Sequence, residues 1–370
     1  MPPGRGESPA VRVHLVDPSA FTPPYDRALA AALARAGVEV ELVTSHFRYG
    51  PVPEPEGYRV AEDFYGRSSR MDGRGRMAVK LAEHVPDMLR YRRRAREADV
   101  VHWQWLTVQP LDVHLLPPGP RVLTAHDVLP REPRPGQVAA TRRLLRRMDA
   151  VVVHSSHGEA RLRELGVERV HVIPHGAFEH LARNPGRVGL PPDLAEVEKP
   201  VVLCFGLMRP YKGIDVLLEA WRGIEAAELW LVGMPRMDID TLVRSSPPGV
   251  RWVPRFVTDA EIPAFFRRAD LVVLPYREID QSGVLYTALA FGKPLVLTEV
   301  GGFPEVAAHG AARLVPPGDA GALGAGLSEL LADPAGREEM ARAAAAAAAG
   351  PYSWDAVAER TIALYRDLLR

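Results

Sequence analysis

The sequence predicts an α/β protein with two doubly wound, Rossmann-like domains, each built on a parallel sheet. Short apolar, β-branched runs alternate with helical patterns along the whole chain, and such runs are typical of parallel strands covered on both faces. The alternating series occurs twice, each time over about the length of one nucleotide-binding unit. Between the two series, residues 178–199 are polar, rich in Pro and Gly, and without a clear period, which indicates a domain join.

The first series supplies the elements of the N-terminal domain. We expect strands at residues 11–16, 38–44, 100–103, 121–124, 150–154 and 170–173, and helices at residues 26–36, 77–97, 137–148 and 155–165. The segment His154-Ser155-Ser156-His157 has the pattern of a helix start, with Ser155 or Ser156 as the N-cap. We place this domain at residues 1–185.

The second series supplies the C-terminal domain, which we place at residues 186–350. We expect strands at residues 201–205, 228–232, 250–253, 271–274, 295–298 and 313–315, and helices at residues 214–221, 239–244, 260–268, 284–291, 303–308 and 320–331. An Ala-rich helix at 337–349 is stopped by Gly350-Pro351. Ser353 can then N-cap a last amphipathic helix at 354–369, so residues 351–370 form a separate segment.

Composition excludes several functional classes. Hydrophobic residues make up 47% of the 370-residue chain and the formal net charge is zero, which argues against nucleic acid as a partner. The single cysteine, Cys204, allows no disulfide framework and no Cys-based metal site, and it lies in an apolar run as a buried strand residue would. Residues 1–9 do not resemble a signal peptide, and no stretch of eighteen apolar residues occurs. We therefore expect a cytoplasmic protein, with attachment to the inner face of the membrane as the alternative.

The loop at residues 205–213 carries two cations between a strand and a helix. Gly206 lets the chain turn sharply at the carboxyl end of the strand, where ligands bind in open α/β sheets. Arg209 and Lys212 follow on the same short loop, and such a pair suits two linked phosphates. The alternative is a pair of solvated loop charges.

A second loop, at residues 275–284, ends in a helix start that suits an anion. The backbone amides of Gln281, Ser282, Gly283 and Val284 are expected to form a site for a diphosphate. Glu278 and Asp280 precede them as candidates to contact the reacting sugar. Gly292 is expected to end this helix as a left-handed cap, and the next residue, Lys293, is interpreted as a cation at the helix C-terminus rather than as a ligand contact.

These motifs resemble those of the retaining glycosyltransferases of family 4, also called group 1 glycosyl transferases. The matching segments are residues 206–213, 269–276, 281–283, 290–294, 300–305 and 352–365, in the right order and spacing across roughly residues 200–370. Residues 22–26, 124–127 and 172–176 match more loosely. The resemblance implies the GT-B architecture, in which two Rossmann-like domains face a central cleft. The N-terminal domain would bind the acceptor and the C-terminal domain the nucleotide sugar, with the last helix crossing back.

The resemblance also implies a role for each matched position. Arg209 and Lys212 would bind the donor's phosphates and residues 281–284 the distal phosphate. Arg255 and Phe256 would lie against the base, and Thr287 near the ribose. His126 and Asp127 would contact the transferred sugar as catalytic residues, beside an acceptor or sugar loop made of Pro24, Tyr25 and Asp26.

The implied reaction moves a hexose-type sugar from a nucleotide-diphosphate sugar to an acceptor hydroxyl with retention of configuration. By resemblance the enzyme uses cationic side chains and helix dipoles in place of a metal, and needs no cofactor. A UDP- or GDP-sugar would be the donor, and a glycan, a lipid-linked molecule or a small molecule the acceptor. Basic helical faces at residues 90–96 and 142–147 are solvated arginines or, alternatively, contacts to anionic lipid.

One departure from the family pattern concerns two glutamates that the family carries eight residues apart. Counted back from Gly292, these positions hold Ile279 and Thr287. Glu278 or Asp280 could replace the first carboxylate if the loop is shifted by one residue. Two other classes therefore stay open: a nucleotide-sugar epimerase of the same architecture, and a non-catalytic relative that binds nucleotide sugars.

Overall fold

The computed structural model describes residues 10–50, 52–130, 133, 135–183 and 188–370. They fold as two compact units. The first unit runs to Pro174 and includes Trp354–Arg370, and the second comprises His175–Ser353. The chain thus passes between units at residues 174 and 175, earlier than the 185/186 join expected from the sequence, and the last helix belongs to the first unit.

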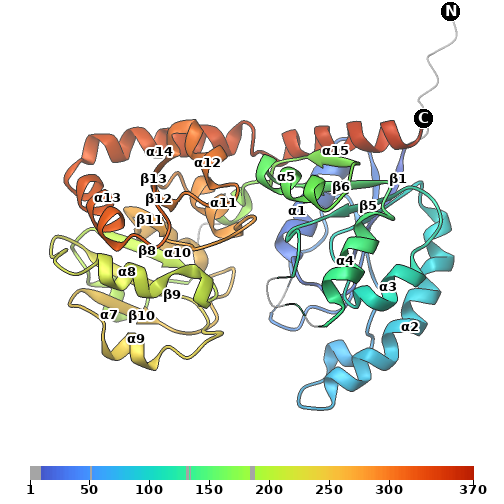
Figure 1. The fold of residues 1–370 in the computed structure, drawn as a ribbon, viewed down its shortest axis with the longest axis horizontal. Coiled ribbons are helices and arrows are strands. Elements are labelled where there is room, and N and C mark those ends of the chain that lie inside the picture. The colour runs from blue at the N-terminus through green and yellow to red at the C-terminus, as the bar shows by residue number, and fades with distance from the viewer. Residues whose placement is uncertain (1–9, 51, 131–132, 134, 184–187) are drawn as a thin grey trace, which may run out of the picture. The chain divides into compact units, whose positions relative to one another are not determined.

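The first unit is a parallel sheet with helices on both faces (Figure 1). Its strands are β1 (Arg12–Asp17), β2 (Glu39–Thr44), β3 (Arg59–Glu62), β4 (Val100–Trp103), β5 (Arg121–Thr124), β6 (Ala150–Val153) and β7 (Val170–Val172). Its helices are α1 (Pro23–Arg35), α2 (Arg76–Arg94), α3 (Gln109–Leu115), α4 (Gln137–Leu145), α5 (Ser156–Glu164) and α15 (Trp354–Leu368), with short 3₁₀ turns at Ser68–Arg70 and Ala95–Glu97.

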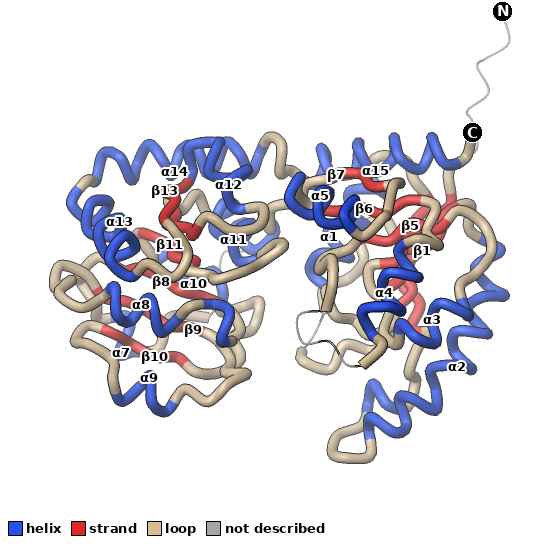
Figure 2. The backbone as a smooth tube through the Cα atoms, viewed as in Figure 1, coloured by secondary structure: helices blue, strands red, loops and turns tan. Residues whose placement is uncertain are grey.

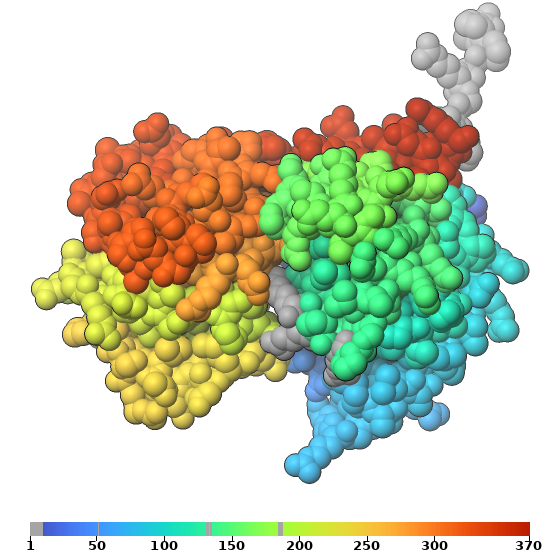
Figure 3. Space-filling model, viewed as in Figure 1, coloured from blue at the N-terminus to red at the C-terminus, as the bar shows by residue number. Residues whose placement is uncertain are grey.

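The strand order of this sheet is β3-β2-β1-β4-β5-β6-β7, with all neighbours parallel. The core on one face packs side chains of β1, β4 and β6 against α2, α3, α4 and α5. Helix α1 contacts β1 and β2, and α15 packs against α1. Figure 3 shows α15, coloured red, on the surface of this unit.

The second unit repeats the architecture. Its strands are β8 (Val201–Phe205), β9 (Glu228–Val232), β10 (Val250–Val253), β11 (Leu271–Leu274), β12 (Leu295–Thr298) and β13 (Ala312–Val315). Its helices are α6 (Glu179–Arg183), α7 (Pro192–Ala195), α8 (Ile214–Ala220), α9 (Asp240–Arg244), α10 (Ile262–Arg268), α11 (Gly283–Ala290), α12 (Phe303–Val306), α13 (Ala320–Ala332) and α14 (Pro334–Ala349), with a 3₁₀ turn at Pro210–Lys212 and a π turn at Ala307–Ala311.

The order of the second sheet is β10-β9-β8-β11-β12-β13, again with parallel neighbours. Alternate residues of β8 enter different cores, because successive side chains of a strand point to opposite faces. Val201 and Leu203 pack with α10, α11 and α14, while Val202 and Cys204 pack with α8 and α13. Cys204 is buried as predicted, and this burial raises the pKa of its thiol to about 11.

The fold class predicted from the sequence is confirmed: two parallel-sheet α/β units of the doubly wound kind. Ser155 caps α5 by accepting a hydrogen bond from the Gly158 amide, and Gly292 has the left-handed φ of +59° that was expected of it. The sequence pattern did not predict the short elements β3, α3, α6 and α7. Figure 2 shows the loops, in tan, that connect the helices and strands of both units.

Candidate active site

The second sheet changes direction between β8 and β11. The chain adds β9 and β10 on one side of β8, and β11, β12 and β13 on the other. The loops after β8 and β11 therefore leave neighbouring strands at the same edge, at the point where doubly wound sheets bind ligands. These are the two loops in which the sequence predicted the phosphate site.

The two loops meet at Lys212. Its Nζ donates a hydrogen bond of 2.8 Å to the hydroxyl of Tyr276, which lies on the loop after β11. The same hydroxyl lies 3.3 Å from Oγ of Ser282, and the Lys212 Nζ is 4.8 Å from the centre of the Tyr276 ring. All three side chains are buried, Lys212 with 6% of its surface exposed. The structure thus brings together a cation and a helix-start residue that are far apart in sequence.

Glycines allow the loops to approach so closely. Gly206 has a φ of +105°, and a Cβ placed on it would lie 3.0 Å from Lys212 Nζ and 3.1 Å from a methyl group of Val284. A Cβ on Gly213 would collide with the carbonyl oxygen of Pro275, and one on Gly301 with that of Ile279. Backbone that must come this near to its neighbours requires glycine, so the shape of the site is set by these positions.

Arg277 ties the turn that carries Lys212 to the loop after β11. Its guanidinium donates two hydrogen bonds to the Asp215 carboxylate, at 2.9 and 2.5 Å, and one of 3.0 Å to the Pro210 carbonyl. Its backbone N–H donates to the Tyr211 carbonyl at 2.8 Å. The hydrogen bond from Arg277 lowers the pKa of Asp215, so this carboxylate stays charged. Arg209, at the start of the turn, is half-buried.

The loop before α11 contains the predicted carboxylates in different surroundings. Glu278 is exposed, whereas Asp280 is 8% exposed, and its backbone carbonyl accepts a hydrogen bond from Gly302 at 3.3 Å. Gln281 is half-buried, and its side-chain oxygen lies 3.3 Å from the Ser282 amide nitrogen. Ser282 is the N-cap of α11, so the first amides of the helix, on Gly283 and Val284, lie beside the Lys212 cluster.

Of the residues predicted to meet the base and ribose, Arg255 and Thr287 make hydrogen bonds within the second unit, while Phe256 is exposed. Arg255 pairs with Glu261 at 2.6 Å, and this hydrogen bond is the main cause that lowers the Glu261 pKa to about 2. Phe256 is 42% exposed. The hydroxyl of Thr287 donates to the Gly283 carbonyl of its own helix at 2.9 Å, so its proton is used within α11.

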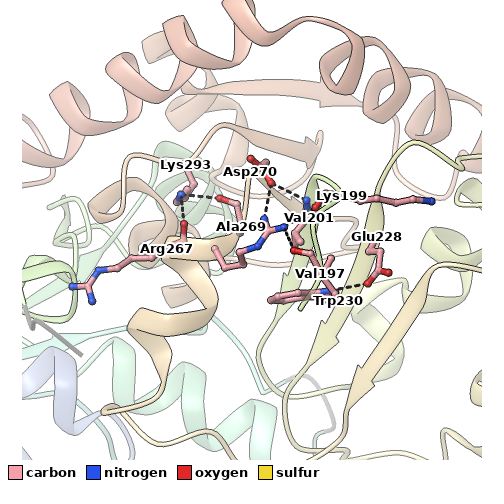
Figure 4. A network of polar contacts seen from close by, with 10 residues as sticks. Val197, Lys199, Val201, Glu228, Trp230, Arg267, Ala269, Asp270 and Lys293 are labelled. Atoms are coloured by element: carbon pink, nitrogen blue, oxygen red, sulfur yellow. Dashed lines mark hydrogen bonds and ion pairs between the residues drawn. The ribbon is translucent and has the colours of Figure 1, made fainter. Parts of the chain in front are cut away.

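Lys293 follows α11 but does not cap that helix. Its Nζ donates to the carbonyls of Arg267 and Ala269, at 3.2 and 2.7 Å, as Figure 4 shows. These carbonyls belong to the end of α10 and the residue after it. Lys293 is therefore a cation at a helix C-terminus, as expected, although the helix is α10 and not α11. Burial lowers its pKa.

In the first unit, His126 lies in a group of rings at the carboxyl edge of the sheet. Its Nε2 is 3.2 Å from the Gln104 side-chain oxygen, and its Nδ1 is 3.2 Å from Nε2 of His154. Trp105 stacks on the imidazole at 5.2 Å, and Tyr25 meets it edge-on at 4.7 Å. The segments after β4, β5 and β6 and the start of α1 contribute to this group, and Asp127, the next residue after His126, is half-buried.

The predicted acceptor loop is folded inward at two of its three residues. Tyr25 is 3% exposed and Asp26 1% exposed, while Pro24 is half-buried. The carboxylate of Asp17 accepts backbone hydrogen bonds from Ser19, Phe21 and Thr22, at 3.2, 2.5 and 3.1 Å. Burial raises the pKa of both carboxyls, most strongly that of Asp26, where the nearby Asp17 charge adds to the effect. Asp26 therefore lies inside the loop as a buried carboxyl whose neutral form is favoured by its surroundings.

Sequence reasoning missed the residues whose partners are distant in the chain. Tyr276 and Arg277 join the loops after β8 and β11, and although Tyr276 lies in the matched segment 269–276, nothing in the sequence indicated these contacts. Gln104 was not among the predicted site residues, and His154 was noted only as part of a helix start. One feature of the sequence could have pointed to Lys80, which is one of only four lysines in a chain that otherwise uses arginine.

Among the described residues, no group of three or more His, Cys, Asp or Glu side chains is arranged to hold a metal ion. No helix in the described part of the chain is both long and apolar enough to span a membrane.

Comparison with known protein families gives one match in each half of the chain. Residues 26–177 match the family described as Glycosyltransferase Family 4, and residues 199–333 match the family described as Glycosyl transferases group 1. A D-inositol 3-phosphate glycosyltransferase of Kineococcus radiotolerans is 28% identical over 98% of this chain and 92% of its own length. A phosphatidyl-myo-inositol mannosyltransferase of Mycobacterium leprae is 34% identical over 52% of each chain.

Solved structures share the fold across nearly the whole chain. Sucrose-phosphate synthase from Thermosynechococcus elongatus gives a TM-score of 0.77 at 21% identity and covers 97% of this chain and 99% of its own. The Anabaena protein HepE, solved in complex with UDP-glucose, gives a TM-score of 0.74 at 19% identity, with 96% and 99% covered. With two matched family halves and the GT-B fold, the chain belongs to the group 1 glycosyltransferases of family 4.

Proposed function

We propose that this glycosyltransferase moves a hexose from a nucleotide-diphosphate sugar to an acceptor hydroxyl, with retention of anomeric configuration and without a metal ion. The observation that supports the proposal is the contact of Lys212 with Tyr276 beside Ser282, the N-cap of α11. A buried cation next to helix amides, at the switch point of a doubly wound sheet, suits the diphosphate of such a donor.

In the proposed reaction, the bond between the anomeric carbon and the diphosphate oxygen breaks while the acceptor oxygen bonds to the same face of that carbon. The acceptor's proton passes to the departing phosphate oxygen. Lys212, Arg209 and the amides of Gly283 and Val284 stabilise the negative charge that develops on the leaving group. These groups would supply the charge that a metal ion supplies in other transferases.

The absence of the two family glutamates would affect contacts to the donor's sugar and ribose, and not the contacts to its phosphates. Ile279 is 8% exposed and Thr287 keeps its proton within α11. Asp280 is the buried carboxylate nearest to the first missing position, so it is the better candidate for the sugar, and exposed Glu278 the weaker one. Thr287 can only accept a hydrogen bond from a ribose hydroxyl, a weaker contact than a carboxylate gives.

The donor is proposed to be a UDP- or GDP-sugar. HepE, which shares the fold, was solved with UDP-glucose, and a GDP-mannose:glycolipid 4-beta-D-mannosyltransferase of Xanthomonas campestris is 36% identical over 26% of this chain. The test is an NMR assay of product formed from each sugar nucleotide in the presence of EDTA. Retention predicts a product with the anomeric configuration of the donor, and an inverted product or a requirement for added metal would refute that part.

For the acceptor, the first unit offers a cation at the same sheet edge as His126. Lys80 Nζ donates to Ser19 Oγ at 2.8 Å and lies 4.7 Å from the Tyr65 ring centre and 5.5 Å from that of Phe21. Burial, and secondarily Arg76, lowers the Lys80 pKa to about 8. An anionic group on the acceptor would stabilise this cation, and two of the relatives are named for inositol phosphate or phosphatidylinositol acceptors.

The acceptor proposal is tested with D-inositol 3-phosphate and unphosphorylated inositol as probes. We expect transfer to the phosphorylated probe only, and a rise of about tenfold or more in its KM in Lys80→Met, since charged hydrogen bonds contribute about 1.5–3 kcal/mol. Lys199→Met, at an exposed lysine, is the control. Equal use of both probes would show that the acceptor needs no anionic group.

Contact with a membrane would depend on arginines of α2 that are not paired with carboxylates. Arg94 pairs with Glu41 and Asp63, and Arg90 with Asp87, which leaves exposed Arg92 and Arg93 for lipid headgroups on this face of α2. A cytoplasmic enzyme at the inner face of the membrane would sediment with anionic vesicles and not with neutral ones. Equal sedimentation of Arg92→Gln/Arg93→Gln and wild type would exclude this face.

The family match and the named relatives do not favour the epimerase alternative. The non-catalytic alternative makes a different prediction, which is donor binding with neither transfer nor slow donor hydrolysis. The EDTA assay above therefore also decides between a transferase and a binding protein.

A further inference from the structure

His154 is a buried histidine outside the predicted site that reaches the proposed sugar-contact residue. It follows β6, it is 4% exposed, and burial lowers its pKa to about 4. At neutral pH the imidazole is therefore uncharged, with one N–H and one lone pair. Which nitrogen carries the proton follows from its partners.

The Ile173 carbonyl fixes the tautomer of His154. Nδ1 of His154 lies 3.0 Å from this backbone oxygen, and a carbonyl oxygen can only accept. Nδ1 must then carry the proton, which leaves a lone pair on Nε2. Because Nε2 lies 3.2 Å from Nδ1 of His126, that second nitrogen must be the donor.

We infer that His154 is a positioning residue that holds His126 in the tautomer protonated at Nδ1 and so commits only its Nε2 to chemistry. This inference rests on the proposed function in one respect, namely that His126 contacts the transferred sugar. The contacts that carry it are the chain from the Ile173 carbonyl through His154 to His126.

Gln104 lies at the other nitrogen of His126. Its side-chain oxygen is 3.2 Å from His126 Nε2, and within the described residues its own amide nitrogen is buried without a hydrogen-bond partner. With the amide oxygen facing His126, Nε2 must also carry a proton and the ring is a cation. Turning the amide by half a rotation satisfies the buried nitrogen, which then donates to the Nε2 lone pair of a neutral ring. Both arrangements keep the proton on Nδ1.

The surroundings of His126 restrain its ring as well. Trp105 stacks on one face and Tyr25 lies edge-on, with Tyr25 also 5.5 Å from the His154 ring. Tyr25 is buried and its pKa is raised by that burial, so it stays neutral. A sugar hydroxyl that binds the ring nitrogen of His126 must therefore approach Nε2 and displace Gln104.

The test is two-bond ¹H–¹⁵N correlation NMR of histidine-labelled protein at pH 8, without substrate. In wild type we expect a proton on Nδ1 of both His126 and His154, and a lone pair on Nε2 of His154. His154→Leu, which removes the acceptor, should convert His126 to a mixture of tautomers. His154→Gln, whose amide oxygen reaches about as far as imidazole Nε2, should restore the wild-type pattern, and exposed His157→Gln is the control.

Kinetics of the same variants separate the inference from the proposed function. We expect kcat of His154→Leu to fall about 10- to 100-fold, because the His126 ring proposed to contact the transferred sugar is then no longer held in one tautomer, and His154→Gln to recover most of it. A tautomer mixture on wild-type His126, or an unchanged His126 pattern in His154→Leu, would overturn the inference. A fixed tautomer in a wild type that transfers no sugar would refute the proposed function and leave the inference standing.

Discussion

At the scale of single residues, the choice between lysine and arginine is informative. Lys212 is almost wholly buried, with its ammonium between Gly206 and the Tyr276 hydroxyl. A compact ammonium fits this gap, whereas a planar guanidinium is larger and presents its donors as a fork. In a chain with four lysines, this position uses the residue that the space requires.

The Asp17 and Asp26 pair allows a prediction with a matched control. We expect Asp26→Asn to leave the free energy of unfolding at pH 7 unchanged or higher, since the amide keeps the shape of the side chain and places no charge beside the buried Asp17 carboxyl. Asp17→Asn should lower it by about 1–3 kcal/mol, because three backbone N–H groups then face a side chain with half the acceptor capacity.

The pH dependence of the pair has a definite sign. The Asp26 pKa is higher in the folded than in the unfolded state, so its contribution is fully present at low pH and is lost as the pH rises through the folded pKa. Urea unfolding of wild type and Asp26→Asn from pH 5 to 9 measures this. A wild-type stability that falls no faster than that of Asp26→Asn over this range would contradict a raised pKa of Asp26 in the folded state.

At the scale of elements, the hydrogen bonds from Arg277 to Asp215, at the start of α8, and to the Pro210 carbonyl position the turn that carries Lys212. Arg277→Met should weaken donor binding by roughly two- to fivefold, since exposed pairs contribute about 0.2–1 kcal/mol. Arg313→Met, which breaks an exposed pair with Glu329, serves as the control in the same unit. Calorimetric titration with the donor measures both affinities. Equal affinities for the two variants would show that Arg277 does not position the turn that carries Lys212.

Helix α15 offers a second element-scale prediction, because it is docked by a buried histidine. His102 lies 2.6 Å from the Tyr365 hydroxyl and 2.7 Å from that of Thr124, and burial lowers its pKa to about 3. A lowered pKa means that the neutral form is favoured by folding. Stability is therefore complete above the unfolded value of 6.5 and falls as the pH drops towards 3, by up to about 1.4 kcal/mol per pH unit.

His102→Gln should flatten this acid dependence, while exposed His114→Gln should not. The measurement is the free energy of unfolding at pH 7 and pH 4.5 for wild type and both variants. If His102→Gln loses as much stability on acidification as wild type, the buried histidine does not control the acid response of α15.

Helices and strands were predictable from the sequence where the residues of the segment itself show an apolar run or a helical period. Interior strand β11 is a continuous apolar run and β4 is apolar except for His102, and the bounds of both were predicted without error. Edge strand β3 reads Arg-Val-Ala-Glu, half-buried at its centre and exposed at its ends, so it has no apolar run to find. Within the site, local motifs identified Lys212 and Ser282, but the Tyr276 that joins them is a contact made by folding.

At the scale of the whole molecule, both units have the same strand arrangement, but the side chains at the corresponding sheet edge differ. In both sheets the strand order changes direction beside the first strand, and polar side chains gather in the loops that follow. The second unit places cations and helix amides there, which suits a diphosphate. The first places histidines, aromatic rings and Lys80 there, which suits a sugar and an acceptor. This division of chemistry agrees with the family to which the chain belongs.

The central claim is that the Lys212 cluster binds the donor's diphosphate, and calorimetric titration tests it directly. We expect one of UDP, GDP, ADP and dTDP, or its sugar conjugate, to bind wild type, and Lys212→Ala to bind it about 10- to 100-fold more weakly, as the loss of a charged hydrogen bond of about 1.5–3 kcal/mol requires. Lys199→Ala should bind like wild type. Equal affinity of Lys212→Ala and wild type, or no binding of any nucleotide, would contradict the claim.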